Sequence, residues 1–78
     1  MKTVLITGSN GLLGQKLVEL LVQQPTIKVI ATARGENRVP FTEGYDYHSM
    51  DITNREEVTS VVEKTLPDAI IHGAAMTN

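Results

Sequence analysis

The sequence contains no cysteine, no apolar run long enough to cross a membrane and no excess of positive charge. Without cysteine the chain forms no disulfide, thiol nucleophile or zinc–thiolate site, which fits a reducing compartment. Its uninterrupted aliphatic stretches, such as residues 4–6 and 20–22, are too short for a membrane span or a signal-peptide core. We therefore expect a soluble, cytoplasmic protein with no membrane partner.

Positive charge is not concentrated in any part of the chain. The seven lysine and arginine residues are scattered from Lys2 to Lys64, and nine acidic residues give a formal net charge of −2. Domains that bind nucleic acid gather basic residues on one face or stripe. We therefore expect no nucleic-acid partner, and no group of residues has the spacing of a metal site.

The 78 residues are enough for at most one domain. Along them, segments with the residue spacing of strands alternate with segments that have the spacing of helices. Short β-branched and apolar runs predict four strands, at residues 3–7, 28–33, 46–50 and 69–72. Helical spacing predicts a first helix that ends at Gln24, because Pro25 forbids continuation. It predicts a second helix that ends at Leu66, before Pro67. The polar run 34–44 is expected to be a connection without a helix.

The order of these elements predicts the topology of the sheet. Thr53 and Glu56 have the spacing of a capping box, which would begin the second helix. Strands that alternate with crossover helices predict an α/β fold with a parallel sheet in the order 3-2-1-4. In that order the loops after Thr7 and His72 face one crevice, where we expect a ligand. His72 itself is expected to be a packed, hydrogen-bonded residue at the end of its strand.

A glycine-rich segment joins the first predicted strand to the first predicted helix. Gly8 would permit a tight turn, Gly11 would let backbone amides approach a diphosphate, and Gly14 would let the helix pack on the sheet. The helix N-terminus would add free N–H groups and a partial positive charge. An ordinary glycine-rich turn is the alternative, but the strand and helix on either side favour nucleotide binding. The candidate ligands are Gly8, Ser9, Asn10, Gly11, Leu12, Leu13 and Gly14.

The end of the second predicted strand indicates which nicotinamide dinucleotide would bind. An NAD enzyme needs a carboxylate there for the ribose hydroxyl, whereas this chain has Ala33 and Arg34. A guanidinium pairs with a 2′-phosphate, so the sequence favours NADP and leaves NAD open. Arg38 is a second candidate for this contact. Both arginines could instead be solvated loop residues, and Glu36 could contact a ribose hydroxyl.

The spacing Thr-Gly-x-x-Gly-x-x-Gly resembles the extended branch of the short-chain dehydrogenase/reductase superfamily. Asp51 and Ile52 resemble its adenine-contacting pair, and residues 72–75 resemble its His-x-Ala-Ala segment. The resemblance therefore implies Asp51, Ile52, Ala74 and Ala75 as further cofactor contacts, although Asp51 could also serve the turn before the second helix. It implies a Rossmann-like sheet flanked by helices, the N-terminal portion of a doubly wound fold.

Residues 66–78 look most like the dTDP-4-dehydrorhamnose reductase group of sugar-nucleotide reductases, which implies a role in dTDP-rhamnose biosynthesis. The resemblance then implies an NADP-dependent oxidoreductase that reduces a nucleotide-sugar ketone. A nucleotide-sugar epimerase or dehydratase and a non-catalytic NADP-binding regulatory subunit stay open, because a fold alone does not decide function. The oligomeric state is also open, with a homodimer of the complete protein as one candidate.

The superfamily's Tyr-x-x-x-Lys pair is not found in this sequence. Tyr45 is followed at that spacing by Ser49, and Tyr47 is followed by Asp51. We therefore expect residues 1–78 to be the N-terminal part of an NAD(P)-binding Rossmann domain, without the catalytic and substrate-binding parts and without catalytic residues. The chain by itself is expected to be inactive.

Overall fold

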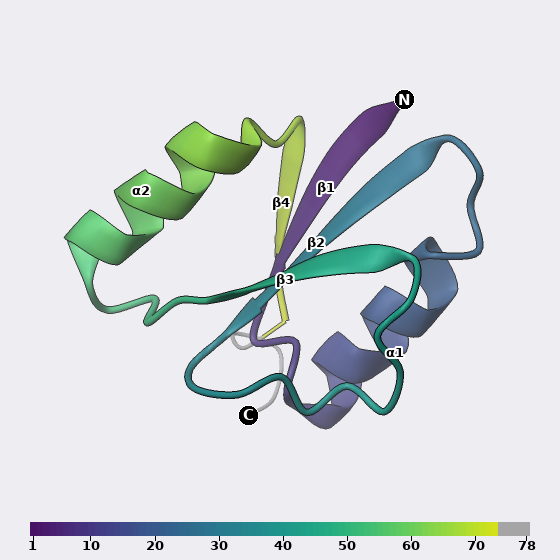
Figure 1. Ribbon diagram of the computed structural model, residues 1–78, viewed down its shortest axis with the longest axis horizontal. Coiled ribbons are helices and arrows are strands. Elements are labelled where there is room, and N and C mark those ends of the chain that lie inside the picture. Colours follow the sequence, from purple (N-terminus) through teal and green to yellow (C-terminus); the bar gives the residue numbers. More distant parts are fainter. Residues whose placement is uncertain (74–78) are drawn as a thin grey trace.

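The computed structural model describes residues 1–73, which form a four-stranded sheet with one helix on each side (Figure 1). Along the chain the elements are β1 (Lys2–Thr7), α1 (Leu12–Leu21), β2 (Ile27–Ala33), β3 (Tyr45–Ser49), α2 (Arg55–Thr65) and β4 (Ala69–His72). Neither helix in this described part has the length and apolar character that a membrane crossing requires. The α/β class predicted from the sequence is confirmed.

All neighbouring strands pair in parallel, in the order β3-β2-β1-β4 that the sequence predicts. The central strand β1 pairs with β2 as far as Thr7↔Thr32 and with β4 as far as Thr7↔His72. Because the strands are parallel, their carboxyl ends lie along one edge of the sheet. The loops after Thr7, Ala33 and Ser49 therefore begin side by side.

The two faces of the sheet carry separate apolar clusters, because successive residues of a strand point to opposite faces. On one face Val4 and Ile6 of β1 pack with Val18 of α1. On the other, Leu5 of β1 packs in one cluster with Val61 of α2. The two central strands, β1 and β2, are therefore covered on both faces, as their continuous apolar runs predict. The strand β4 lies at one edge of the sheet and leaves Ile70 44% exposed.

The first helix ends at Leu21 and not at Gln24 as predicted. The backbone N–H of Gln24 donates to the carbonyl of Leu21, and the N–H of Ile27 donates to the carbonyl of Gln24. These turns return the chain to the sheet, where the N–H of Lys2 donates to the carbonyl of Thr26. The helix ends early because β2 has to begin beside the first residue of β1.

The capping box predicted from Thr53 and Glu56 is wrong by one residue. Oδ1 of Asp51 accepts hydrogen bonds from both the N–H and the hydroxyl of Thr53, so that hydroxyl is already used in the turn. The cap of α2 is Asn54, whose side-chain oxygen accepts from the backbone N–H of Glu57 at 3.2 Å. The Glu57 carboxylate in turn accepts from the N–H of Asp51.

The connection between β2 and β3 contains no helix, as predicted, but side chains hold it in a defined shape. Oη of Tyr47 lies 2.7 Å from the carbonyl oxygen of Gly35. The side-chain amide of Asn37 donates to Oη of Tyr45, and Val39 is buried in the cluster beneath α1. The segment is therefore fixed to both the sheet and α1.

Candidate functional site

The loop between β1 and α1 turns through a conformation that suits glycine. Gly8 has a φ of 69°, in the left-handed region that a residue with a Cβ rarely adopts. The backbone N–H of Gly11 donates to the carbonyl of Gly8 at 3.1 Å and closes the turn. Gly8 thus has the turning role that the sequence predicts.

Gly14 and Gly73 lie where two backbone segments approach each other closely. A Cβ on Gly14 would lie 2.1 Å from the carbonyl oxygen of Gly8 and 2.7 Å from Cα of Ser9. A Cβ on Gly73 would lie 2.7 Å from the carbonyl oxygen of Thr7 and 3.3 Å from Cα of Gly14. Sequence reasoning missed the need for glycine at position 73. The sequence signal that could have revealed it is a glycine directly after the strand that pairs with β1.

The N-terminus of α1 has no cap, in contrast to that of α2. Gly11 occupies the N-cap position without a side-chain hydrogen bond, and the first turn contains no acidic residue. By comparison, α2 has Asn54 as its cap and two glutamates in its first turn. The first N–H groups of a helix have no partner within the helix. Within residues 1–73 the amides of Leu12 and Leu13 therefore remain available as anion donors.

Ser9 and Asn10 attach this loop to its surroundings. The backbone N–H of Ser9 donates to the carbonyl of Thr32 at 3.0 Å, and its side chain is fully buried. Among the described residues, Oγ of Ser9 has no hydrogen-bond partner. The side chain of Asn10 reaches the loop after β2, where Nδ2 donates to the carbonyl of Glu36 at 2.8 Å. Ser9 thus fixes the loop to β2, while Asn10 connects two loops.

A cavity of about 230 Å³ lies over the carboxyl ends of β1, β2 and β3. It borders the glycine-rich loop, and Ala33, Met50 and Ile52 give it an apolar lining. Its lining residues are Thr7, Gly8, Asn10, Thr32, Ala33, Arg34, Met50 and Ile52. The sequence predicts a crevice between the first and fourth strands, whereas this cavity extends from β1 toward β3. Its size and lining suit a flat, largely apolar group next to an anion site.

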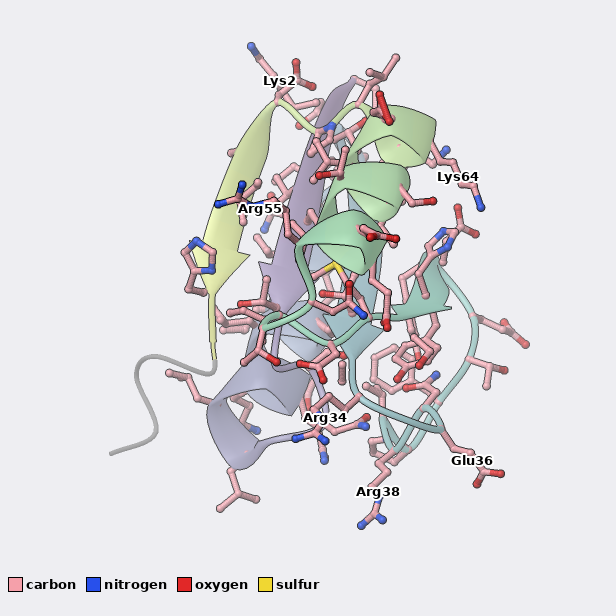
Figure 2. The ribbon with its side chains drawn as sticks, turned by 90° about the vertical axis from the view of Figure 1, so that its left-hand side faces the viewer. Lys2, Arg34, Glu36, Arg38, Arg55 and Lys64 are labelled. Atoms are coloured by element: carbon pink, nitrogen blue, oxygen red, sulfur yellow. The ribbon has the colours of Figure 1, made fainter. Side chains whose placement is uncertain are left out.

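Arg34 lines the mouth of this cavity and has a side chain that is 78% exposed. Its Nε lies 3.7 Å from Oδ2 of Asp51. Hydrogen bonds from the hydroxyl and the N–H of Thr53, with a smaller contribution from Arg34, lower the pKa of Asp51 below its ordinary value. Asp51 therefore serves the turn before α2, the alternative left open from the sequence, and also faces Arg34. Figure 2 shows Arg34 and Arg38 at the end of the molecule opposite Lys2.

Tyr47 and His72, near this edge, have structural contacts. Oη of Tyr47 lies near the carbonyl oxygens of Ala33 and Gly35, and burial raises the pKa of this phenol above its ordinary value. Oγ1 of Thr7 and Nδ1 of His72 share a hydrogen bond of 3.2 Å. His72 is exposed, so its predicted hydrogen bond is found but its predicted burial is not. The predicted contacts Ala74 and Ala75 lie outside the described residues.

The sequence profile of the NAD dependent epimerase/dehydratase family matches residues 4–78. The chain is 35% identical over 78 residues to a dTDP-4-dehydrorhamnose reductase from Aggregatibacter actinomycetemcomitans. This alignment covers 100% of this chain and 22% of that protein. It is 36% identical over 74 residues to a GDP-6-deoxy-D-talose 4-dehydrogenase from the same organism, over 95% of this chain and 21% of that protein. The chain thus spans only about a fifth of the length of these relatives.

A solved structure with the same fold is a short chain dehydrogenase from Leptospira borgpetersenii with bound NAD+. It is 31% identical to this chain and superposes with a TM-score of 0.74, over 91% of this chain and 30% of the other. The likeness confirms the Rossmann-like arrangement of the sheet and helices.

Proposed function

Because the chain belongs to the NAD dependent epimerase/dehydratase family, we propose that it is the NADP(H)-binding segment of an oxidoreductase that reduces a nucleotide-sugar ketone. In this proposal residues 1–78 are the N-terminal part of a Rossmann domain, and the substrate-binding part is separate. The observation that carries it is the uncapped N-terminus of α1, which adjoins an apolar cavity with an arginine at its mouth.

The residues present fit a dinucleotide in three parts. The diphosphate would accept hydrogen bonds from the amides of Leu12 and Leu13 at the N-terminus of α1. The adenine would lie in the cavity against Met50 and Ile52. The 2′-phosphate would pair with Arg34 at the cavity mouth. Gly14, which packs α1 against the loop, would hold these donors in place.

The cofactor, when bound, supplies the hydride, while the protein must orient the substrate and provide a proton for its oxygen. The names of the two bacterial relatives support a nucleotide-sugar substrate, since one is a reductase of dTDP-4-dehydrorhamnose and the other a 4-dehydrogenase of GDP-6-deoxy-D-talose. We therefore propose the reduction of a keto group on a sugar nucleotide, with the dTDP-linked sugar as the first substrate to test.

A second candidate is a nucleotide-sugar epimerase or dehydratase, which the description of the matching family favours. Such an enzyme keeps its dinucleotide bound and returns it to its initial state in each turnover. The complete protein would distinguish the two, because a reductase consumes NADPH in proportion to product, whereas an epimerase or dehydratase does not.

Replacing Arg34 with alanine should weaken NADPH binding about tenfold more than NADH binding. The loss of one charged hydrogen-bonding partner typically costs about 1.5–3 kcal/mol, and Asp51 would then face the 2′-phosphate without its cationic neighbour. The measurement is a calorimetric titration of the protein with each dinucleotide. Arg55→Ala, an exposed arginine at the start of α2, is the matched control. If Arg34→Ala weakened the binding of both dinucleotides equally, or of neither, Arg34 would not be the residue that contacts the 2′-phosphate. Arg38→Ala would then be tested in the same way.

The 78-residue chain alone should show no reductase activity even if it binds NADPH. Tyr45 and Tyr47 have no lysine at the required spacing, and the raised pKa of Tyr47 opposes a role in proton transfer. The assay follows NADPH absorbance with a panel of nucleotide-4-keto-sugars, beside the chain carrying Tyr45→Phe and Tyr47→Phe. Substrate-dependent oxidation that disappears in the double variant would contradict this expectation.

A further inference from the structure

The side chain of Asn10 connects the glycine-rich loop to the loop that follows β2. Its Nδ2 donates to the carbonyl of Glu36 at 2.8 Å and lies 3.4 Å from the carbonyl of Arg34. Its Oδ1 accepts a hydrogen bond from the backbone N–H of Arg38 at 2.7 Å. One amide thus binds the backbone of three residues that lie 24 to 28 positions further along the chain.

The arch of residues 34–38 depends on such hydrogen bonds more than on packing. At Gly35, where φ is 76°, no atom of residues 1–73 beyond its two chain neighbours lies within 4 Å of the position that a Cβ would take. Arg34, Glu36 and Arg38 are exposed, and apolar packing resumes only at Val39. Between the end of β2 and Val39, the arch is held by Asn10 from one side and by Tyr45 and Tyr47 from the other.

The main chain of Asn10 belongs to the other loop and is held there independently. Its carbonyl accepts a hydrogen bond from Nε2 of Gln15 at 2.8 Å. The neighbouring turn is closed by Gly11 and Gly8 through their own backbone atoms. Removing the side chain of Asn10 would therefore remove the link between the arch and the glycine-rich loop while leaving these backbone contacts of the glycine-rich loop in place.

We propose that Asn10 is a positioning residue for cofactor choice, which places the arginines of residues 34–38 relative to the diphosphate loop and so sets the preference for NADPH over NADH. This inference rests on the proposed function, because it assumes that a nicotinamide dinucleotide binds here. Figure 2 shows the two side chains that would be placed, Arg34 and Arg38, at the same end of the molecule, with Glu36 directed outward beside them.

Two parts of a single ligand would bind to the two loops that Asn10 connects. The diphosphate and the 2′-phosphate of NADP are joined by the adenosine, so their binding groups must be held at a fixed separation. Asn10 is a direct side-chain link between the two loops, from the start of α1 to the arch. Its loss should therefore affect the 2′-phosphate more than the rest of the dinucleotide.

The test is the ratio of the dissociation constants for NADH and NADPH, measured by calorimetry in four proteins. These are the wild type, Asn10→Ala, Arg34→Ala/Arg38→Ala and the triple variant. Asn10→Ala should lower the preference for NADPH about fivefold, the size expected for one or two hydrogen bonds. In the protein that already lacks Arg34 and Arg38, Asn10→Ala should alter the ratio by less than about twofold, because the effects of coupled residues are not additive.

Gln23→Ala is the control for the loss of an amide side chain. Gln23 is exposed, and its Nε2 donates to the carbonyl of Glu19, four residues earlier, instead of linking the glycine-rich loop to the arch. It should leave the ratio within about twofold of the wild type. Thermal unfolding of each variant verifies that the comparison is made on folded protein.

Each result has a separate meaning. An unchanged ratio in folded Asn10→Ala, or an equal change with and without the arginines, would overturn the positioning role of Asn10 and leave the proposed function intact. A wild-type protein that binds neither dinucleotide would overturn the proposed function, and this inference with it, before any variant is compared.

Discussion

Replacing Gly14 with alanine is expected to lower the free energy of unfolding by more than about 3 kcal/mol, at the upper end of overpacking costs. The added Cβ would lie 2.1 Å from the carbonyl oxygen of Gly8 and 2.7 Å from Cα of Ser9. Both are backbone atoms, which cannot rotate away as a side chain would. Either α1 must separate from the sheet, or the loop must move and lose the bond from Ser9 to Thr32.

Urea unfolding followed by circular dichroism measures this effect, and Gly35→Ala provides the matched control. Gly35 has a φ of 76°, but in the described part of the chain only its two neighbours lie near the position that an added Cβ would take. Alanine there should cost only the strain of the left-handed conformation, about 1–2 kcal/mol. If Gly14→Ala were no more destabilising than Gly35→Ala, the close contact between α1 and the glycine-rich loop would be refuted.

Replacing Gly11 with valine is expected to abolish NADPH binding while leaving the fold intact. The backbone of Gly11 has φ −76° and ψ 167°, an extended conformation that valine adopts readily. The backbone conformation therefore does not require glycine at this position. A branched side chain directly before Leu12 and Leu13, however, would stand where a diphosphate has to approach their amides.

Calorimetry with NADPH measures the loss of affinity, and the melting temperature verifies the fold. Thr59→Val introduces the same side chain on an exposed position of α2 and should bind NADPH as the wild type does. Unchanged affinity for NADPH in a folded Gly11→Val protein would show that the diphosphate does not bind at this loop. A Gly11→Val protein that fails to fold would contradict the expectation that valine is tolerated at this position.

The sequence predicts the strand order and the main roles of Gly8 and Gly14, because these depend on short-range patterns and general rules of connection. Alternating strands and helices with right-handed crossovers leave few topologies. A glycine between a strand and a helix predicts a turn, and one a turn further along predicts close packing. Both features are present in the structure.

Other features depend on side-chain contacts, which residue spacing alone does not reveal. The cap of α2 shifts to Asn54 because Asp51 already holds the hydroxyl of Thr53 within the same turn. The link from Asn10 to the arch after β2 spans as many as 28 residues. The ion pair of Arg34 with Asp51 joins the ends of two strands that only the folded sheet brings together. These last two contacts depend on how the folded sheet places distant segments, which sequence patterns do not specify.

In the proposed function, one end of the sheet binds NADPH through the N-terminus of α1 and the adjoining cavity. The most direct test is to follow backbone amide chemical shifts by NMR during a titration with NADPH. We expect saturable changes that are largest at Leu12, Leu13 and Arg34. Changes that are largest on the outer face of α2, at Thr59 and Glu63, or no saturable change at all, would contradict it.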